Sequence, residues 1–277
     1  MSKRYKLGTA LLLLAPLALA QILVSAARAG AAREEGRLLT ATEVLEEVQG
    51  MPDQRIPDAL LAHAYGIAVI PDVTNLAFIF GGRHGNGVMS VRRDLNAPWS
   101  NPVCVALTGG SWGLQAGVQS ADIILVFTTQ RGVEGVSGGK FTLGADASVA
   151  AGPVGRQGSV STDPTFNAEI YSYARTRGLF GGIALEGSVL AIDRSANASL
   201  YHQQGITATD IISGRSSPPP EAGQRFLARL ASSAHGAVRA APAAAAPAAA
   251  TAPPPAQSAP PPSAADAPRT YPLEEPK

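Results

Sequence analysis

Short apolar runs separated by Gly, Pro, Asn and Asp dominate the chain from Gly66 to Tyr201. These runs have strand length and are rich in β-branched and aromatic residues; they cover 66–70, 76–80, 87–92, 103–107, 122–129, 145–151, 168–174 and 188–193. None of the gaps between them holds a long segment with 3.6-residue periodicity, so repeated βαβ units are not expected. We predict an α+β domain that is mainly β, a glycine-rich antiparallel barrel or sandwich with short flanking helices.

Helical periodicity is confined to segments that flank the predicted strands. A first helix is predicted to begin at Thr40, because Glu43 follows at the spacing of a capping box, and to end at Gly50. A second short helix is predicted over 57–65, with proline at its first turn.

The C-terminal side of the domain has two further helical patterns. A short capped helix is predicted over 206–214, and residues 221–235 place Phe226, Leu227 and Leu230 at helical spacing. This second segment is expected either to dock on the domain or to lie on a membrane, and docking is favoured.

The ends of the chain differ in composition from the glycine-rich region. Lys3, Arg4 and Lys6 precede an apolar run over 7–27, and the sequence Ala-Arg-Ala at 27–29 fits a signal-peptide cleavage site. An uncleaved membrane anchor is the alternative, because the run is long enough to span a bilayer. At the other end, 14 of the 22 prolines lie between positions 218 and 276, mixed with alanine. Such a segment buries too little side-chain area to offset its ordering entropy.

These features predict five segments along the chain. Residues 1–29 are a signal peptide or uncleaved anchor, 30–38 a spacer and 39–215 the folded domain. A proline-led short helix follows over 216–240, and 241–277 form a disordered Ala/Pro-rich tail.

Charge and cysteine content exclude several functions. Between Arg37 and Arg215 there are eleven Arg and one Lys against nine Asp and six Glu, a net charge of −3, which does not favour nucleic acid as a partner. The single cysteine, Cys104, excludes an intramolecular disulfide and is expected to be a buried apolar residue. One local basic group stands out, Arg83-His84 with Arg92-Arg93, around a predicted hairpin.

Motifs typical of enzymes occur without their usual context. Residues 109–113 match G-x-S-x-G, so a serine hydrolase using Ser111 with Asp193 and His202 is an alternative. A nucleophile elbow needs a helix after the serine, however, and a strand-like run follows here. Residues 138–142 resemble the end of a phosphate-binding loop but lack its serine or threonine after Lys140, and we interpret them as a turn. The four histidines are scattered, so no metal or cofactor is expected.

The ordered glycine motifs resemble the SYLF-domain family over roughly residues 37–215. The matching segments are 56–57, 66–71, 81–82 with Gly85 and Gly87, 99–100 with Pro102, 113–117, Asp122, 143–144, 152–156, 171–173, 178–180 with Gly182 and Gly187, Asn197, Tyr201 and Ile211. The resemblance implies phospholipid binding, with phosphoinositide preference in eukaryotic members, and no enzymatic activity.

For this chain the resemblance implies an exported, periplasmic protein, or one held at the inner membrane, that binds a generic anionic phospholipid. A headgroup site must use the few cations of the domain: Arg83, Arg92 and Arg93, with Lys140 and Arg156 as lesser candidates. A further alternative is a structural envelope protein whose Ala/Pro-rich tail reaches a protein or cell-wall partner.

Overall fold

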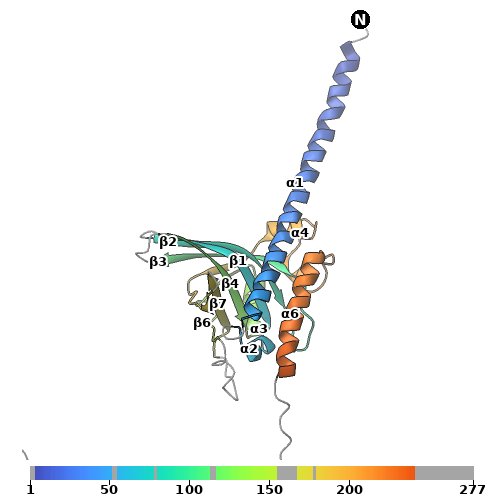
Figure 1. Ribbon diagram of the computed structural model, residues 1–277. Helices are drawn as coiled ribbons and strands as arrows, with labels where there is room; N and C mark the ends of the chain where they lie inside the picture. Colours follow the sequence, from blue (N-terminus) through green and yellow to red (C-terminus); the bar gives the residue numbers. More distant parts are fainter. Residues whose placement is uncertain are drawn as a thin grey trace, which may run out of the picture. The chain divides into compact units, whose positions relative to one another are not determined.

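The apolar runs form one curled sheet in the computed structural model, which describes residues 4–51, 55–77, 80–112, 117–154, 167–176 and 179–240 (Figure 1). The strands are β1 (Gly66–Ala77), β2 (Phe80–Val91), β3 (Val103–Trp112), β4 (Gly117–Phe127), β5 (Lys140–Thr142), β6 (Val149–Ala151), β7 (Ile170–Thr176), β8 (Leu179–Gly182) and β9 (Val189–Ile192). The helices are α1 (Arg4–Gln49), α2 (Asp58–Ala62), α3 (Gln130–Ser137), α4 (Arg194–Leu200), α5 (Ala208–Ile212) and α6 (Glu221–Ala240).

The described strands pair in the order β5-β9-β3-β2-β1-β4-β7-β6, and β8 pairs with β7 beside β6. Every pairing is antiparallel except that of β6 with β7. The predicted α+β, mainly β class is confirmed. Within the described residues the sheet is a half-barrel, because β5 ends it on one side and β6 with β8 on the other.

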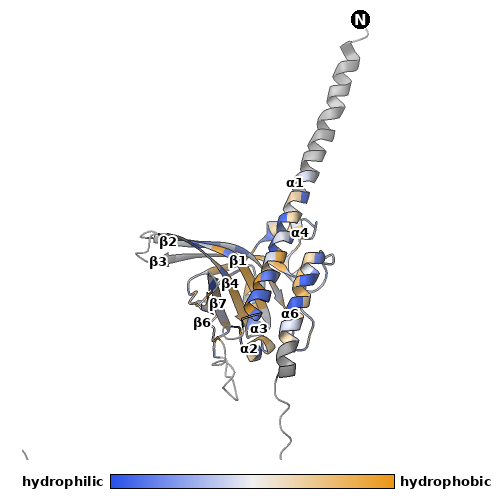
Figure 2. Ribbon diagram, viewed as in Figure 1, coloured by the Kyte–Doolittle hydropathy of each residue, from blue (hydrophilic) through white to orange (hydrophobic). Residues whose placement is uncertain are grey.

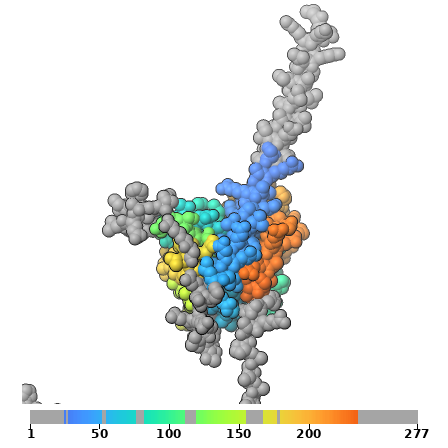
Figure 3. All heavy atoms as spheres, in the orientation of Figure 1, coloured from blue at the N-terminus to red at the C-terminus, as the bar shows by residue number. Residues whose placement is uncertain are grey.

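Both faces of the central strands are buried, which explains why they read as continuous apolar runs. Along β1, Ile67 and Val69 belong to the core beneath the helices, whereas Ala68 and Ile70 belong to a second core on the opposite face. Figure 2 shows this apolar character in the central strands. The first core is covered mainly by α1 and α6, which lie side by side in Figure 3, and the second includes residues of α3 and β5.

The first helix is longer than the hydrophobic pattern predicts. It includes the whole segment 30–38 that we expected to be a spacer, and Leu38 is fully buried. Thr40 therefore lies inside the helix, where its hydroxyl donates to the carbonyl oxygen of Gly36 (3.2 Å) instead of capping a new helix. A helix of sufficient length and apolarity to cross a membrane is not found among the described residues. The leader assigned to 1–29 stays a prediction.

The C-terminal helices agree with the sequence. Thr207 and Asp210 form a capping box at the start of α5. In α6, Phe226 and Leu230 are fully buried and Leu227 is partly buried against the core beneath the helices, so this segment docks on the domain. The tail predicted over 241–277 lies outside the described residues.

Several strand boundaries differ from the prediction, because β1, β2, β3 and β4 are each longer than the apolar runs, and β5 and β8 were not predicted. Residues 76–80 are not one strand: β1 ends at Ala77 and β2 begins at Phe80. At Pro71-Asp72, where we expected a strand to end, β1 continues through a bulge, and Asp72 has φ of 51°. The glycines of β2 make room for this bulge, because a Cβ on Gly87 would lie 2.3 Å from the carbonyl oxygen of Val69.

A close backbone contact also fixes the edge formed by β6 and β8. A Cβ on Gly182 would lie 2.4 Å from the carbonyl oxygen of Gly152, whereas a Cβ on neighbouring Gly181 would meet nothing within 4 Å. A side chain at residue 182 would therefore clash with backbone atoms, and rearrangement of neighbouring side chains cannot relieve this clash.

We expect Gly182→Ala to lower the free energy of unfolding by about 2 kcal/mol, the typical cost of overpacking. The matched variant Gly181→Ala is expected to leave stability unchanged or to raise it slightly, since alanine restricts the unfolded chain. Urea denaturation followed by circular dichroism measures both. Equal losses for the two variants would show that the close approach at Gly182 is not a stability constraint.

Candidate functional site

The basic residues singled out from the sequence do not gather around one hairpin. Arg83 lies near the start of β2 and Arg92 directly follows its end, so about 30 Å of extended chain separates them. The prediction of one basic group around a hairpin is therefore wrong, because β2 continues as a strand through the glycines that we took as strand breakers. Arg93 lies beside Arg92, Lys140 is exposed on β5, and Arg156 lies outside the described residues.

Arg92 is a buried structural residue. Its guanidinium donates to the carbonyl oxygens of Ala64 (2.6 Å), Leu95 (2.6 Å), Ala62 (2.7 Å) and Leu61 (3.3 Å). Trp99 covers it, with 4.9 Å between the guanidinium carbon and the ring centroid. Burial lowers the pKa of the Arg92 guanidinium. Since the side chain closes the C-terminal end of α2, it is not free to meet a lipid headgroup in this conformation.

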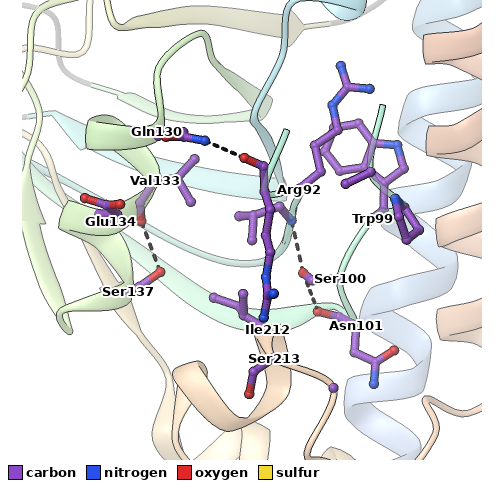
Figure 4. A pocket seen from close by; sticks show the side chains of 15 residues that line it. Arg92, Trp99, Ser100, Asn101, Gln130, Val133, Glu134, Ser137, Ile212 and Ser213 are labelled. Atoms are coloured by element: carbon purple, nitrogen blue, oxygen red, sulfur yellow. Dashed lines mark hydrogen bonds between the residues drawn. The ribbon is translucent and has the colours of Figure 1, made fainter. Parts of the chain in front are cut away.

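A cavity of about 640 Å³ adjoins Arg92, between the end of β2, the following loop, α3 and the end of α5 (Figure 4). Its polar groups are largely engaged: Ser100 accepts from the backbone of Val91 (3.1 Å), Ser137 donates to the Val133 carbonyl (3.1 Å), and the Gln130 amide donates to the Arg93 carbonyl. Arg93 and Glu134 place opposite charges at the exposed margin. This arrangement has neither a nucleophile beside a base nor a concentration of positive charge.

Arg83 is in a different situation. The residue is half-buried on β2, paired in register with Asn75 of β1 and Gly109 of β3. Burial lowers the pKa of its guanidinium, and its Nε is buried without a hydrogen-bond partner. A buried Nε–H without an acceptor is costly, and such a group calls for an explanation, for example a bound ion or water.

A second unsatisfied polar group lies next to Arg83. Ser188 is 1% exposed, and its Oγ has no hydrogen-bond partner. A Cβ placed on Gly109 would lie 2.7 Å from this Oγ and 3.2 Å from Cγ of Arg83, so both side chains crowd the same glycine. Both unsatisfied atoms are buried in this conformation, and together they are a cation and a hydroxyl donor, the chemistry that binds a phosphate oxygen once a ligand reaches them. Sequence analysis missed Ser188; the glycine inside strand β3 was the only local signal of a close approach.

The hydrolase alternative lacks its structural context. Ser111 lies in strand β3, and the next described element is strand β4 rather than a helix. Asp193 serves as the N-cap of α4, accepting from the backbone of Ala196 (2.9 Å) and from the Ser195 hydroxyl (2.7 Å). His202 is exposed and has φ of 52°. In the described part of the chain, Ser111 therefore does not have the strand–turn–helix geometry of a nucleophile elbow.

Other reactive groups are engaged in the fold. Cys104 is buried, and burial raises the pKa of its thiol to about 12. Residues 138 and 139 form a turn between α3 and β5 as expected, whereas residues 140–142, which we also interpreted as part of the turn, form β5. In the described ranges no group of three or more His, Cys, Asp or Glu side chains is arranged to hold a metal ion.

Comparison with known proteins points to one family. Residues 108–233 match the sequence model of the family Ysc84, described as "Las17-binding protein actin regulator". "LAS seventeen-binding protein 3" of Saccharomyces cerevisiae is 37% identical over 171 residues, which are 61% of this chain and 37% of the yeast protein.

Vertebrate relatives match over a similar stretch. "SH3 domain-containing YSC84-like protein 1" of Xenopus laevis is 32% identical over 195 residues, covering 70% of this chain and 57% of that protein. The Bos taurus protein of the same name is 34% identical over 172 residues, covering 62% of this chain and 50% of that protein. The chain thus spans between about a third and just over half of the length of these relatives. The resemblance inferred from the ordered glycine motifs is confirmed: residues 108–233 match the model of the Ysc84, or SYLF, family.

Proposed function

We propose that the domain binds membranes that contain anionic phospholipids and that it does so without catalysing a reaction. The observation that carries this proposal is Arg83, a half-buried cation whose Nε has no partner, beside the equally unsatisfied hydroxyl of Ser188. A lipid phosphate supplies the negative charge and the acceptor oxygens that both groups lack.

The charge of the domain supports a local site over general attraction. With a net charge of −3 between Arg37 and Arg215, the domain as a whole is repelled by an anionic surface. Binding must then rest on a particular cation whose contact with phosphate outweighs this repulsion. Of the five candidates, Arg92 is engaged in the fold, and Arg83 is the cation already desolvated and unpaired.

The wider setting is part of the same proposal. The basic and apolar pattern of residues 1–29 supports export to a periplasm, or retention at the inner membrane if the leader is not cleaved. The Ala/Pro-rich tail would extend from the domain toward a protein or cell-wall partner. The descriptions of the family and of the yeast relative refer to Las17 binding and actin regulation. The domain can bind a protein partner as well as a membrane if the two use different faces.

Co-sedimentation of the full chain with vesicles tests the proposal. We expect more binding to vesicles of phosphatidylglycerol and phosphatidylcholine in equal parts than to phosphatidylcholine alone. The difference should shrink as salt rises toward about 0.5 M, where the Debye length falls to roughly 4 Å. Because the apolar leader can bind either vesicle, the difference between the two compositions is the readout. Equal binding to both compositions at low salt would overturn the proposal.

A further inference from the structure

A groove runs between α1 and α6 on the surface of the domain. Figure 1 shows the two helices running in the same direction, and Figure 3 shows them side by side at the surface. The residues that line this α1–α6 groove are Leu39, Thr42, Glu43 and Glu46 of α1 and Arg225, Ala228, Arg229 and Ser232 of α6. Each helix therefore contributes residues two turns apart to one continuous face.

The charges of the groove are sorted by helix. Glu43 and Glu46 are exposed acids on α1, whereas Arg225 and Arg229 are bases on α6. None of the ion pairs among the described residues joins the two helices across the groove. Arg225 pairs instead with Glu221 of its own helix (2.6 Å), an exposed pair that contributes little and exchanges easily. One copy thus presents an acidic row beside a basic row.

The acidic and basic rows are level with each other along the helices. A Cβ on Gly223 of α6 would lie 3.7 Å from Cδ1 of Leu38 of α1, so these two positions are level. Both helices rise about 1.5 Å per residue, so five residues further on Glu43 is level with the segment between Arg225 and Arg229. A twofold axis parallel to the helices keeps every residue at its level and brings α1 of one copy opposite α6 of the other. The acidic row of each copy then meets the basic row of its partner.

An exposed leucine adds an apolar contact to this face. Leu39 is 40% exposed, one of two large apolar side chains left exposed among the described residues. The same axis places it against α6 of the partner, where alkyl stems of arginine offer apolar surface. Since α6 has 20 residues and a helix is about 10 Å wide, the two helices present about 600 Å² in each copy. A total near 1,200 Å² is at the lower limit for specific interfaces.

We propose that the α1–α6 groove is the interface of a symmetric homodimer, in which Glu43 and Glu46 of each copy pair with Arg225 and Arg229 of the other. A second copy supplies both complementary rows at the matching level. Both copies of α1 then run in the same direction, so their N-terminal ends leave the dimer on one side. The inference is independent of the proposed lipid binding, because it involves no residue of the headgroup site.

Paired charge reversals test the interface, with self-association of the full chain measured by sedimentation velocity in a mild detergent. The α1 variant carries Glu43→Lys and Glu46→Lys, and the α6 variant carries Arg225→Glu and Arg229→Glu. The apolar leader is the same in every sample, so differences between samples report on the groove. Each variant places like charges opposite one another in its own homodimer. We therefore expect each to self-associate at least about 100-fold more weakly than the wild type.

An equimolar mixture of the two variants separates pairing between chains from pairing within one chain. In a heterodimer the reversed α1 row of one variant meets the reversed α6 row of the other, and the two natural rows also meet. We expect a heterodimer with an affinity within about tenfold of the wild-type dimer. Pairing within one chain cannot restore association, because in each variant the groove carries charges of one sign. As a control, Glu134→Lys with Glu186→Lys makes the same change of net charge at exposed residues outside the groove and should leave association unchanged.

Three results would overturn the proposed dimer. The first is a wild type that stays monomeric at about 100 µM, which would leave the groove to a helix of another protein. The second is a variant mixture that does not associate. The third is an equal loss of association in the control and the α1 variant. Circular dichroism checks the fold of each sample; if a double variant unfolds, the single reversals Glu46→Lys and Arg229→Glu are mixed instead, with the same expected and contrary results.

Discussion

Replacement of Arg92 by methionine is expected to lower the free energy of unfolding by about 3 kcal/mol. The guanidinium donates to three carbonyl oxygens around the end of α2 and to that of Leu95 in the loop after β2, and methionine fills much of the volume without supplying a donor. Buried acceptors left unsatisfied cost about 1–3 kcal/mol each, although water can reach some of them here. The stacking of the guanidinium on Trp99 is lost as well.

Arg92→Lys is the matched variant, since it keeps the positive charge but removes the planar fork of donors. Lysine can satisfy only part of the carbonyl set, so we expect about half the destabilisation of the methionine variant. Urea denaturation at neutral pH measures both. A loss below about 0.5 kcal/mol for methionine would contradict the structural role assigned to Arg92, because surface substitutions stay within that range.

Much of the fold follows from local sequence because the central strands are buried on both faces. The run at 66–70 lies in β1, and the run at 122–129 lies in β4 up to Phe127, where that strand ends. The capping box at Thr207 and the apolar stripe through Phe226 and Leu230 likewise specify α5 and the docking of α6. In these elements the local pattern and the tertiary environment favour the same structure.

The errors arise where a residue's role depends on distant chain. The glycines of β2 look like breakers, yet they lie in a strand because the bulge of β1 approaches them closely. The helices α3 and α4 are too short to show a periodic stripe, and only their capping residues, Thr129 and Asp193, mark where they begin. The start of α1 is missed because the spacing of Thr40 and Glu43 fits a capping box, whereas Thr40 lies inside the helix.

The candidate site was predictable only in part. Composition identified Arg83 as one of few cations in an acidic domain, but it could not distinguish this residue from Arg92. The difference lies in long-range contacts. Carbonyl oxygens at the end of α2 surround Arg92. Arg83 and Ser188, which are far apart in the sequence, instead both approach Gly109. Ser188 itself has no sequence signal, because a serine directly before a short strand is usually a surface hydroxyl.

Reversal of charge at Arg83 is expected to abolish most of the lipid-dependent binding. Each cation near an anionic membrane contributes about 1 kcal/mol, so Arg83→Glu should cost about 2 kcal/mol, a weakening of roughly 30-fold. The fold should tolerate the change, because no hydrogen bond or ion pair of the described structure satisfies Arg83 Nε. Glutamate replaces one unpaired, partly desolvated charge by another at the same position, so the urea midpoint is expected to change little.

Arg93→Glu provides the matched control. It changes the net charge of the domain by the same amount, but at an exposed residue just beyond the other end of β2. If binding depended only on the net charge of the domain, the two variants would weaken it equally. A local site at Arg83 instead predicts that Arg93→Glu stays within about twofold of the wild type.

The decisive measurement is side-by-side titration of wild type, Arg83→Glu and Arg93→Glu with vesicles of phosphatidylglycerol and phosphatidylcholine at low salt. The proposed site predicts a roughly 30-fold weaker apparent affinity for Arg83→Glu alone, with circular dichroism unchanged in all three proteins. Equal affinities for wild type and Arg83→Glu, or an equal loss in both variants, would contradict a phospholipid headgroup site at Arg83.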